Sequence, residues 1–337
     1  MSSLVDRDEL LRRVDLAALL DRVTPSPSSG RGRRRRWRCP HPDHEDRHPS
    51  VSIRIVEGVG RWRCWSCGRG GTAIDALICA RAMTVGEAIR QLTTIAHVDP
   101  ILYEPSSDKP VPLHRSVGRY VDACHRILST NTGRPVLDWL TTTRRLDPEV
   151  LEANQVGADP GPRLLRRQRG LPRAGVAAVL PVLDTAGTLA YVQARYLHPT
   201  ARSKYGNPVG RLGTNPGLAW TVTPTLRHPG RLIVCEGILD ALTAATAGLA
   251  AVAALGATYP SVRIAQTIAD HADGRQVLIA FDGDEPGKVA AARLRQLLAP
   301  RGHNAEIVDL PAGTDLNTLA QTTPDWTDTL LDSGVVT

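Results

Sequence analysis

The stretch Arg231-Leu-Ile-Val-Cys-Glu-Gly-Ile-Leu-Asp240 decides the fold of the last third of the chain. Its first five residues form an apolar run of the buried-strand type, and helical spacing follows from Ile238 to Gly248. The alternation then repeats, with strands expected at 250–255, 276–281 and 304–310 and helices at 261–271 and 286–298. This β-α-β-α-β-α-β order predicts a mainly parallel sheet with helices on both faces.

Acidic residues follow three of these strands. Glu236 comes directly after the first strand, Asp282 and Asp284 follow the third, and Asp315 lies in the loop after the fourth. Because the carboxyl ends of parallel strands share one edge of a sheet, we expect these carboxylates to converge in one crevice. Clustered carboxylates repel one another unless a cation bridges them, and ligands that are all oxygen favour Mg²⁺ or Mn²⁺. The alternative is that each acid only caps the helix that follows it.

A second candidate metal site lies near the N-terminus. Cys64-Trp-Ser-Cys67 is a C-x₂-C pair, and Cys39 and His44 precede it. A C-x₂-C turn holds two thiolates on one side of a tetrahedron, and a second pair closes it, so we expect one structural Zn²⁺. The alternative is a redox dithiol, which usually begins a helix in a βαβ unit. The flanks at 61–64 and 67–71 instead indicate a hairpin with a glycine-rich exit.

Arginines and tryptophans surround this set of ligands. Arginines neutralise phosphates and indoles stack on unpaired bases, so we expect a surface for single-stranded DNA. Its expected residues are Arg35, Arg36, Trp37, Arg38, Trp62 and Trp65, and Arg31, Arg33 and Arg34 extend the run. The alternative is a solvated, disordered basic tail.

The chain as a whole is basic. Its 337 residues carry a net charge of +7 with a pI near 9.4, which suits a polyanionic partner. Arginine greatly outnumbers lysine, a skew that also fits a GC-rich genome, so the rare lysines are more informative. The other cysteines, Cys79, Cys124 and Cys235, show no disulfide pattern. No apolar run reaches about 18 residues. These features lead us to expect a cytoplasmic location.

Composition and periodicity divide the chain into five segments. These are a zinc module with flanking helices at 1–98, a proline-rich linker at 99–115, a middle lobe at 116–229, the parallel sheet at 230–320 and a short tail at 321–337. Helices are expected at 6–22, 72–78, 84–92 and 116–152, and strands at 176–183 and 189–196. Thr84 and Glu87 form a capping box at the start of the third helix.

Over nearly its whole length the chain resembles DnaG-type bacterial DNA primases. In the zinc segment the resemblance rests on His44-Glu-Asp-Arg-His-Pro49-Ser50 and on Cys64-Trp-Ser-Cys67-Gly68-Arg-Gly-Gly71. The family usually spaces its first ligand pair as C-x₂-H, whereas here the spacing from Cys39 is longer. Because position 42 is proline, alignment to Pro49-Ser50 gives His44 as the ligand, with His41 as its competitor.

The acidic region resembles the TOPRIM fold that primases share with topoisomerases and some nucleases. The family's Glu-Gly-x₂-Asp motif matches Glu236 to Asp240, and its later Asp-x-Asp appears as Asp315-Leu-Asn317. Asn317 supplies no negative charge, which leaves its role in metal binding open. The resemblance implies a metal site on Glu236, Asp240, Asp282, Asp284 and Asp315, with Glu236, Asp282 and Asp284 as the catalytic residues.

The middle lobe resembles the basic lobe of the family's polymerase at 180–184, 193–195 and 203–208. The resemblance implies that Arg195, Lys204, Tyr205 and Asn207 face the template and the incoming nucleotide. The alternative for Lys204 is an ordinary surface lysine. A zinc ribbon, a basic lobe and a TOPRIM region in this order are more specific together than any one of them alone.

The resemblance implies a DNA primase, a DNA-directed RNA polymerase that makes short RNA primers during replication, associated with the nucleoid. Its expected partners are single-stranded DNA, NTPs and the RNA primer, and its expected cofactors are one Zn²⁺ and catalytic Mg²⁺ or Mn²⁺. A TOPRIM nuclease would use the same carboxylates without the basic lobe, and a non-catalytic DNA-binding protein would not need the acids. The short segment after Ala320 leads us to expect no helicase contact through a C-terminal domain, as in a phage- or plasmid-type primase.

Overall fold

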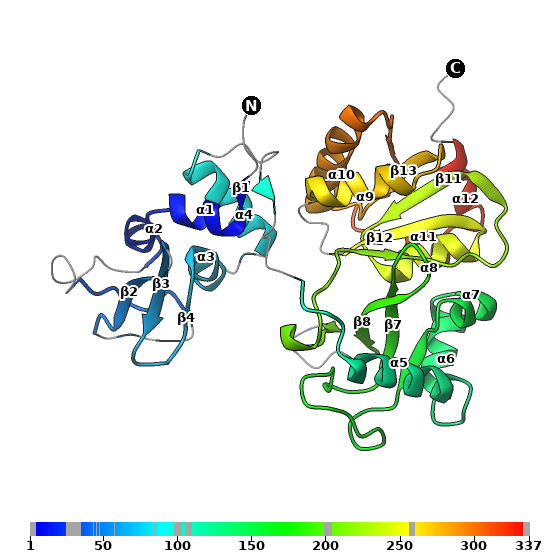
Figure 1. Ribbon diagram of the computed structural model, residues 1–337, viewed down its shortest axis with the longest axis horizontal. Helices are drawn as coiled ribbons and strands as arrows, with labels where there is room; N and C mark the ends of the chain where they lie inside the picture. Colours follow the sequence, from blue (N-terminus) through cyan, green and yellow to red (C-terminus); the bar gives the residue numbers. More distant parts are fainter. Residues whose placement is uncertain are drawn as a thin grey trace. The chain divides into compact units, whose positions relative to one another are not determined.

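The chain forms two compact units, Met1–Asp108 and Lys109–Thr337. The computed structural model describes residues 5–24, 35–97, 103–104, 110–198, 204–255 and 260–332, apart from the single positions 43, 45, 47, 57, 82 and 84 (Figure 1). The division between the units falls within the linker expected at 99–115. That segment also contains a short strand and the first residue of a helix, so it is not a linker throughout.

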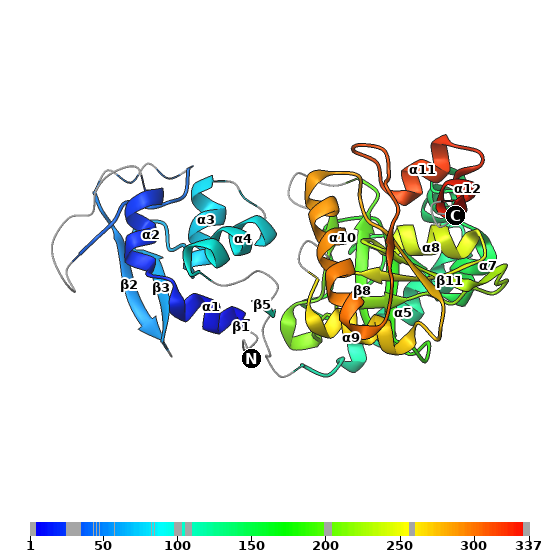
Figure 2. The ribbon, with the colours of Figure 1, turned by 90° about the horizontal axis from the view of Figure 1, so that it is seen from above.

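The N-terminal unit combines a small antiparallel sheet with several helices. The sheet consists of β2 (Val51–Val56), β3 (Val59–Cys64) and β4 (Gly70–Gly71); β1 (Val5–Asp6) pairs with β5 (Tyr103–Glu104); and the helices are α1 (Arg7–Arg13), α2 (Leu16–Val23), α3 (Ala73–Arg81) and α4 (Val85–Ile95). Figure 2 shows β2 and β3 side by side as a hairpin. The expected hairpin and glycine-rich exit are therefore present.

The single helix expected at 6–22 is two helices. Asp15 separates them and caps α2, because its carboxylate accepts hydrogen bonds from the N–H groups of Ala17 and Ala18 at 2.9 and 3.1 Å. The capping box expected at the start of α4 includes Thr84, which lies outside the described residues.

The C-terminal unit is built on one nine-stranded sheet. In spatial order its strands are β14 (Glu306–Ile307), β13 (Gln276–Ala280), β11 (His228–Cys235), β12 (Leu249–Ala254), β10 (Leu218–Trp220), β7 (Ala177–Leu183), β8 (Leu189–Tyr196) and β9 (Tyr205–Gly206), with β6 (Gly157–Asp159) beside β7. The strands from β14 to β12 are parallel, as predicted. β10 is antiparallel to both β12 and β7, so the middle lobe and the parallel region share a single sheet.

Side chains of the parallel strands alternate between two cores. Ile233 and Cys235 pack on one face with helices α8 (Ile238–Thr246) and α11 (Leu316–Thr322). Leu232 and Val234 pack on the other face with α9 (Val262–His271) and α10 (Glu285–Leu298). All four of these strand residues are fully buried, which explains why the run at 231–235 is continuously apolar.

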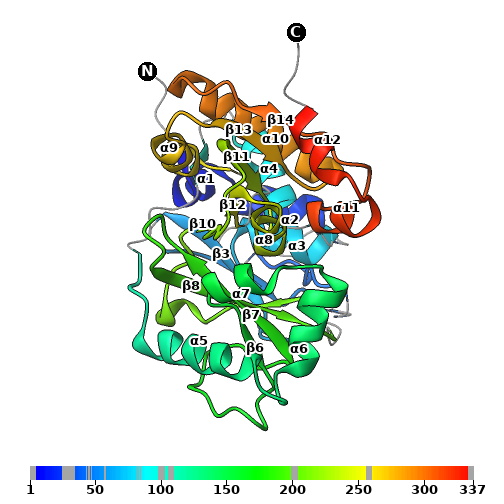
Figure 3. The same cartoon turned by 90° about the vertical axis from the view of Figure 1, so that its right-hand side faces the viewer.

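Helices cover the middle lobe. α5 (Arg115–Leu128) lies along β6, β7 and β8 (Figure 3), and α6 (Arg134–Asp138), the π-helical turn η3 (Trp139–Thr143) and α7 (Pro148–Ala153) follow it. Two breaks therefore interrupt the helical pattern at 116–152.

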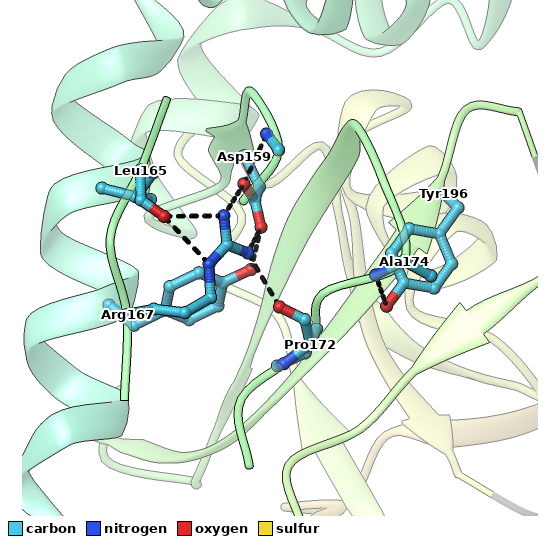
Figure 4. Close-up of polar contacts among 8 residues, drawn as sticks. Asp159, Leu165, Arg167, Pro172, Ala174 and Tyr196 are labelled. Carbon is cyan, nitrogen blue, oxygen red and sulfur yellow. Dashed lines mark hydrogen bonds and ion pairs between the residues drawn. The ribbon is translucent and has the colours of Figure 1, made fainter. Parts of the chain in front are cut away.

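A buried polar cluster fixes the segment that follows β6 (Figure 4). Asp159 forms an ion pair with Arg167, and both side chains are almost inaccessible to solvent. The Tyr120 hydroxyl donates to Asp159 at 2.7 Å, and Arg167 donates to the carbonyl of Pro172 at 2.8 Å. Because each buried charge has partners, the cluster holds the segment that follows β6 against α5.

The expected tail at 321–337 contains helix α12 (Trp326–Asp332). Leu330 is fully buried in the core, and the Arg231 guanidinium donates to the carbonyl groups of Leu330 and Leu331 at 3.4 and 2.8 Å. This part of the chain therefore belongs to the fold of the C-terminal unit. Among the described residues, no helix is long and apolar enough to cross a membrane.

Candidate functional site

A cleft of about 420 Å³ opens where the parallel strands end. Its lining consists of Arg144, Gln193, Arg195, Lys204, Tyr205, Asn207, Glu236, Gly237, Leu239, Asp240, Leu255, Asp282 and Asp315. The cleft therefore brings together the four residues predicted to contact nucleotide or template and all but one of the predicted metal ligands. The exception is Asp284.

The sheet places the acids of the cleft. Glu236 follows the last residue of β11, Asp282 follows β13, and Asp315 caps α11, while Asp240 lies in the first turn of α8. A glycine makes room for them at the start of α10. A Cβ atom at Gly287 would lie 2.9 Å from Glu236 Oε1 and 2.1 Å from the Asp282 carbonyl oxygen, so no side chain fits there.

Burial and mutual repulsion change the acidity of these groups. Burial first, and the charge of Asp282 second, raise the pKa of Glu236 to about 7. Burial and the charge of Asp315 raise the pKa of Asp240 to about 8. Burial and the charges of Asp315 and Asp284 raise the pKa of Asp282 to about 6, although Lys204 opposes this rise. The nearby positive charge therefore does not offset the burial and mutual repulsion of these acids.

A divalent cation fits this cluster. Glu236 Oε1 is buried, and within the described residues it has no hydrogen-bond partner. A buried carboxylate oxygen without a partner is unfavourable unless a cation or a proton satisfies it. Glu236 and Asp282 follow adjacent parallel strands, so they are the acids that could share a divalent cation.

Two of the acids also cap helices. Asp284 accepts a hydrogen bond from the N–H of Gly287 at 2.8 Å at the start of α10, and Asp315 accepts one from Thr318 at 2.6 Å at the start of α11. Capping therefore accounts for the position of Asp284, as the alternative interpretation proposed. Asp315 caps a helix and lines the cleft as well.

The basic side of the cleft is formed by β8, β9 and the residue that precedes β9. Arg195 and Tyr205 are paired across these two strands, and the Arg195 guanidinium lies 5.2 Å over the Tyr205 ring. Lys204 lines the cleft with the acids, and its charge lowers the pKa of Asp282. This placement favours a site role for Lys204 over that of an ordinary surface lysine.

The sequence did not reveal Arg144 as a residue of the site, nor Asn317 as its buried partner. Arg144 lines the cleft directly after the π-helical turn η3, and turns of this kind often occur at functional sites. Asn317 was known only as a missing acid. It is buried, and its side chain binds Arg144, Thr243 and Gln321. No sequence motif around Arg144 indicated this proximity, because 173 positions separate it from Asn317.

The N-terminal unit contains the predicted zinc ligands together. The ligand atoms of Cys39, His44, Cys64 and Cys67 all lie within 4.8 Å of one another. The two sulfurs of Cys39 and Cys67 are 3.8 Å apart, and His44 Nδ1 lies 3.7 Å from Cys64 Sγ. A tetrahedral site with Zn–S bonds of about 2.3 Å has edges of about 3.8 Å. The donor set and its geometry therefore fit Zn²⁺, and the cluster contains His44 rather than His41.

Two of the three tryptophans near this site are not exposed. Trp37 and Trp62 are only 3% and 2% exposed, and their indole N–H groups donate to Asp21 and to the carbonyl of Thr72. Neither indole is accessible to a base, so their predicted stacking role is corrected to one in the core. Trp65 is 65% exposed and remains available.

Some arginines of the run have contacts within the protein, and others lie outside the described residues. Arg35 forms an ion pair with Asp21 at 2.5 Å, and the Nε atom of Arg38 is buried. Arg31, Arg33 and Arg34 lie outside the described residues. Arg35, Arg36 and Arg38 are half-buried, so their role in DNA binding stays a prediction.

Comparisons with known proteins agree with this architecture. Residues 233–320 match the family model described as Toprim-like. A DNA primase of Enterococcus faecalis is 26% identical over 321 residues, which cover 81% of this chain and 50% of that protein. The chain thus spans about half the length of this relative.

Two solved structures share the fold. The zinc-binding and RNA polymerase domains of the Aquifex aeolicus primase match 99% of this chain and 86% of that chain, with a TM-score of 0.51 and 20% identity. A DnaG primase catalytic domain bound to single-stranded DNA matches 65% of this chain and 80% of that chain, also with a TM-score of 0.51 and 20% identity. In sequence and in fold, the chain is thus a relative of the DnaG-type DNA primases that carries a Toprim-like domain.

Proposed function

We propose that the chain is a DNA primase, which synthesises short RNA primers on single-stranded DNA during replication, in the cytoplasm at the nucleoid. The observation that carries this proposal is the cleft itself, in which the predicted metal-binding acids face Arg195 and Lys204. A site for nucleotidyl transfer needs acids for the metal and cations for the phosphates. The similarity to DNA primases supports the same activity.

The residues of the cleft would divide the work as follows. Glu236 and Asp282 would hold Mg²⁺ or Mn²⁺, with Asp240 and Asp315 beside them. When bound there, the metal would supply positive charge for the phosphates during the transfer. Arg195 and Lys204 would bind the triphosphate and the template, so that a 3′-hydroxyl attacks the α-phosphate and pyrophosphate leaves. Tyr205 and Asn207 would complete the nucleotide-binding side.

We place the template-binding surface on the outer face of β2 and β3. Arg54 pairs with Arg61, and Ser52 with Arg63, across the two strands, and all three arginines are exposed. Next to them Trp65 is exposed, its indole N–H donates to Ser52 Oγ at 2.8 Å, and Arg63 lies 5.0 Å over its ring. Arginines beside an exposed indole can bind phosphates and stack on a base. Zn²⁺ on the four ligands would hold this hairpin in shape.

Incubation with single-stranded DNA, Mg²⁺ and labelled NTPs tests this function. Labelled short RNA supports the primase. Cleavage of the template without RNA synthesis would instead support a TOPRIM nuclease, and DNA binding without either product would support a non-catalytic binding protein. A Glu236→Gln variant is the control, because it should lose RNA synthesis and keep DNA binding.

A further inference from the structure

Asp46 is a buried acid beside the zinc ligands, and the ligand cluster does not include it. The residue is only 8% exposed, and a single carboxylate oxygen, Oδ2, accepts three hydrogen bonds. The donors are the backbone N–H of Cys39 at 2.9 Å, the backbone N–H of Ser50 at 3.3 Å and the Ser50 hydroxyl at 2.7 Å. Asp46 therefore joins the first zinc ligand to the last residue before β2.

The contacts of Asp46 close a loop and differ from those of a local turn. An aspartate in a turn accepts from N–H groups two or three positions after it. Here Cys39 lies seven positions before Asp46, and Ser50 lies four positions after it. Just outside these contacts, Trp37 and Val51 exchange two backbone hydrogen bonds at 3.1 and 2.9 Å. The loop 39–50, which carries the first ligand pair, is therefore closed twice.

Ser50 joins this loop to the C-x₂-C turn. Its hydroxyl oxygen lies 3.1 Å from Cys64 Sγ, and its carbonyl oxygen accepts from the N–H of Trp65 at 3.2 Å. A zinc-bound thiolate carries no proton, so the hydroxyl is the group of this pair that can donate. Its proton is then shared between the Cys64 sulfur and the Asp46 carboxylate. The two halves of the ligand set are therefore linked through protein groups as well as through the metal.

We propose that Asp46 and Ser50 are positioning residues of the zinc site, and that they form a clasp between its two ligand pairs. Groups that hydrogen-bond to metal ligands orient them, and loss of such a group typically lowers metal affinity by about 10–100-fold. Four residues separate Cys39 from His44, whereas two separate Cys64 from Cys67. The longer loop loses more conformational entropy when it is ordered, so a second closure has its largest effect there.

The rate of zinc release tests the clasp. The full chain is loaded with Zn²⁺, and a chromophoric chelator in excess then removes the ion. Asp46→Asn keeps the shape of the side chain but replaces the charged acceptor, and Ser50→Ala removes the hydroxyl. We expect each variant to release zinc about tenfold or more faster than the wild type. Ser50→Thr keeps a hydroxyl, so its rate should return toward that of the wild type.

A spectrum separates the positioning role from a general loss of stability. Co²⁺ occupies tetrahedral thiolate sites, and its sulfur-to-metal charge-transfer band depends on the hydrogen bonds that the sulfur atoms accept. Ser50→Ala takes a donor from Cys64 Sγ, which raises the electron density on that sulfur. The band should therefore move to longer wavelength in Ser50→Ala and stay in place in Ser50→Thr.

Ser66→Ala is the matched control. Ser66 lies between the two cysteines of the same turn and is exposed, so its zinc release and its Co²⁺ spectrum should match those of the wild type. Should Asp46→Asn fail to fold, the comparison of Ser50→Ala with Ser50→Thr decides the question. These two variants differ in whether a hydroxyl is present.

Three results would overturn the proposal. The first is zinc release from Asp46→Asn and Ser50→Ala that is no faster than from Ser66→Ala. The second is a rate in Ser50→Thr as high as in Ser50→Ala, and the third is an unshifted Co²⁺ band in Ser50→Ala. These measurements use neither nucleotide nor DNA, so their outcome is independent of primer synthesis.

Discussion

Asp282 and Asp284 are separated by a single glycine, yet only Asp282 lines the cleft. Asp284 instead caps α10 by accepting a hydrogen bond at 2.8 Å from the N–H of Gly287. The Asp284 charge still contributes to the raised pKa of Asp282 and of Glu236. The two acids thus share an electrostatic environment but make different contacts.

We expect substitution of these two acids to have unequal effects. Asp282→Asn removes a charge from the lining of the cleft and should lower primer synthesis by about a hundredfold or more. Asp284→Asn should lower it less, because asparagine is also a good helix cap and the residue does not line the cleft. Gel analysis of labelled RNA gives both values. Affinity for single-stranded DNA should remain equal or become tighter in each variant, and full synthesis by the double variant would refute the catalytic assignment.

Stability should depend on pH and on Mg²⁺ together. The folded-state pKa values of Glu236, Asp240 and Asp282 are about 7, 8 and 6, above the ordinary values of 4.5, 3.8 and 3.8. At a pH between its ordinary and its folded-state pKa, each of these groups is therefore more protonated in the folded chain than in the unfolded chain. It follows that the metal-free protein should lose stability as pH rises from about 4 to 8.

Mg²⁺ should restore that stability, and more so at high pH, where the acids are ionised. At a hundred times its Kd, a ligand adds about 2.7 kcal/mol, which corresponds to about 5–10 °C in Tm for a unit of this size. Thermal unfolding with and without Mg²⁺ at pH 6 and pH 8 measures the difference. An equal shift at both pH values, or none, would contradict the acid cluster as the Mg²⁺ site.

Regular periodicity made the fold of the C-terminal unit predictable. The runs at 231–235 and 276–281 are continuously apolar because both faces of the sheet are covered, and acids directly follow them. The shared sheet was not predictable, because β10 is only three residues long and no strand had been assigned there. The break at Asp15 was also missed, since apolar spacing on both sides of it stays in register with one helix.

The site was predictable where chemistry depends on local spacing. C-x₂-C and the acids after strands are short-range patterns, whereas the contact between Arg144 and Asn317 depends on how η3 and α11 pack. Burial of the tryptophans was missed for a related reason. Trp37 and Trp62 stand among arginines in the sequence, but their side chains face the interior. Trp65, three residues after Trp62, faces solvent.

Zinc content should distinguish the two candidate histidines. His44→Ala should lose Zn²⁺, because its Nδ1 belongs to the ligand cluster, and the N-terminal unit should then become sensitive to proteolysis. His41→Ala should keep a full equivalent of zinc. Metal analysis of both purified variants decides the assignment, and equal zinc content in the two would show it to be wrong.

The three tryptophans should separate DNA binding from folding. Trp65→Ala removes an exposed indole that stacks with Arg63, so it should weaken binding of single-stranded DNA by about 1–3 kcal/mol and leave Tm nearly unchanged. Trp62→Ala leaves a cavity in the N-terminal unit and should lower the free energy of unfolding by about 3–5 kcal/mol. Fluorescence anisotropy with a labelled oligonucleotide across a salt series, together with thermal unfolding, measures both effects.

Because Arg54, Arg61 and Arg63 remain in Trp65→Ala, the salt dependence of its DNA binding should match that of the wild type. Unchanged DNA affinity in Trp65→Ala would remove the outer face of β2 and β3 as the template-binding surface.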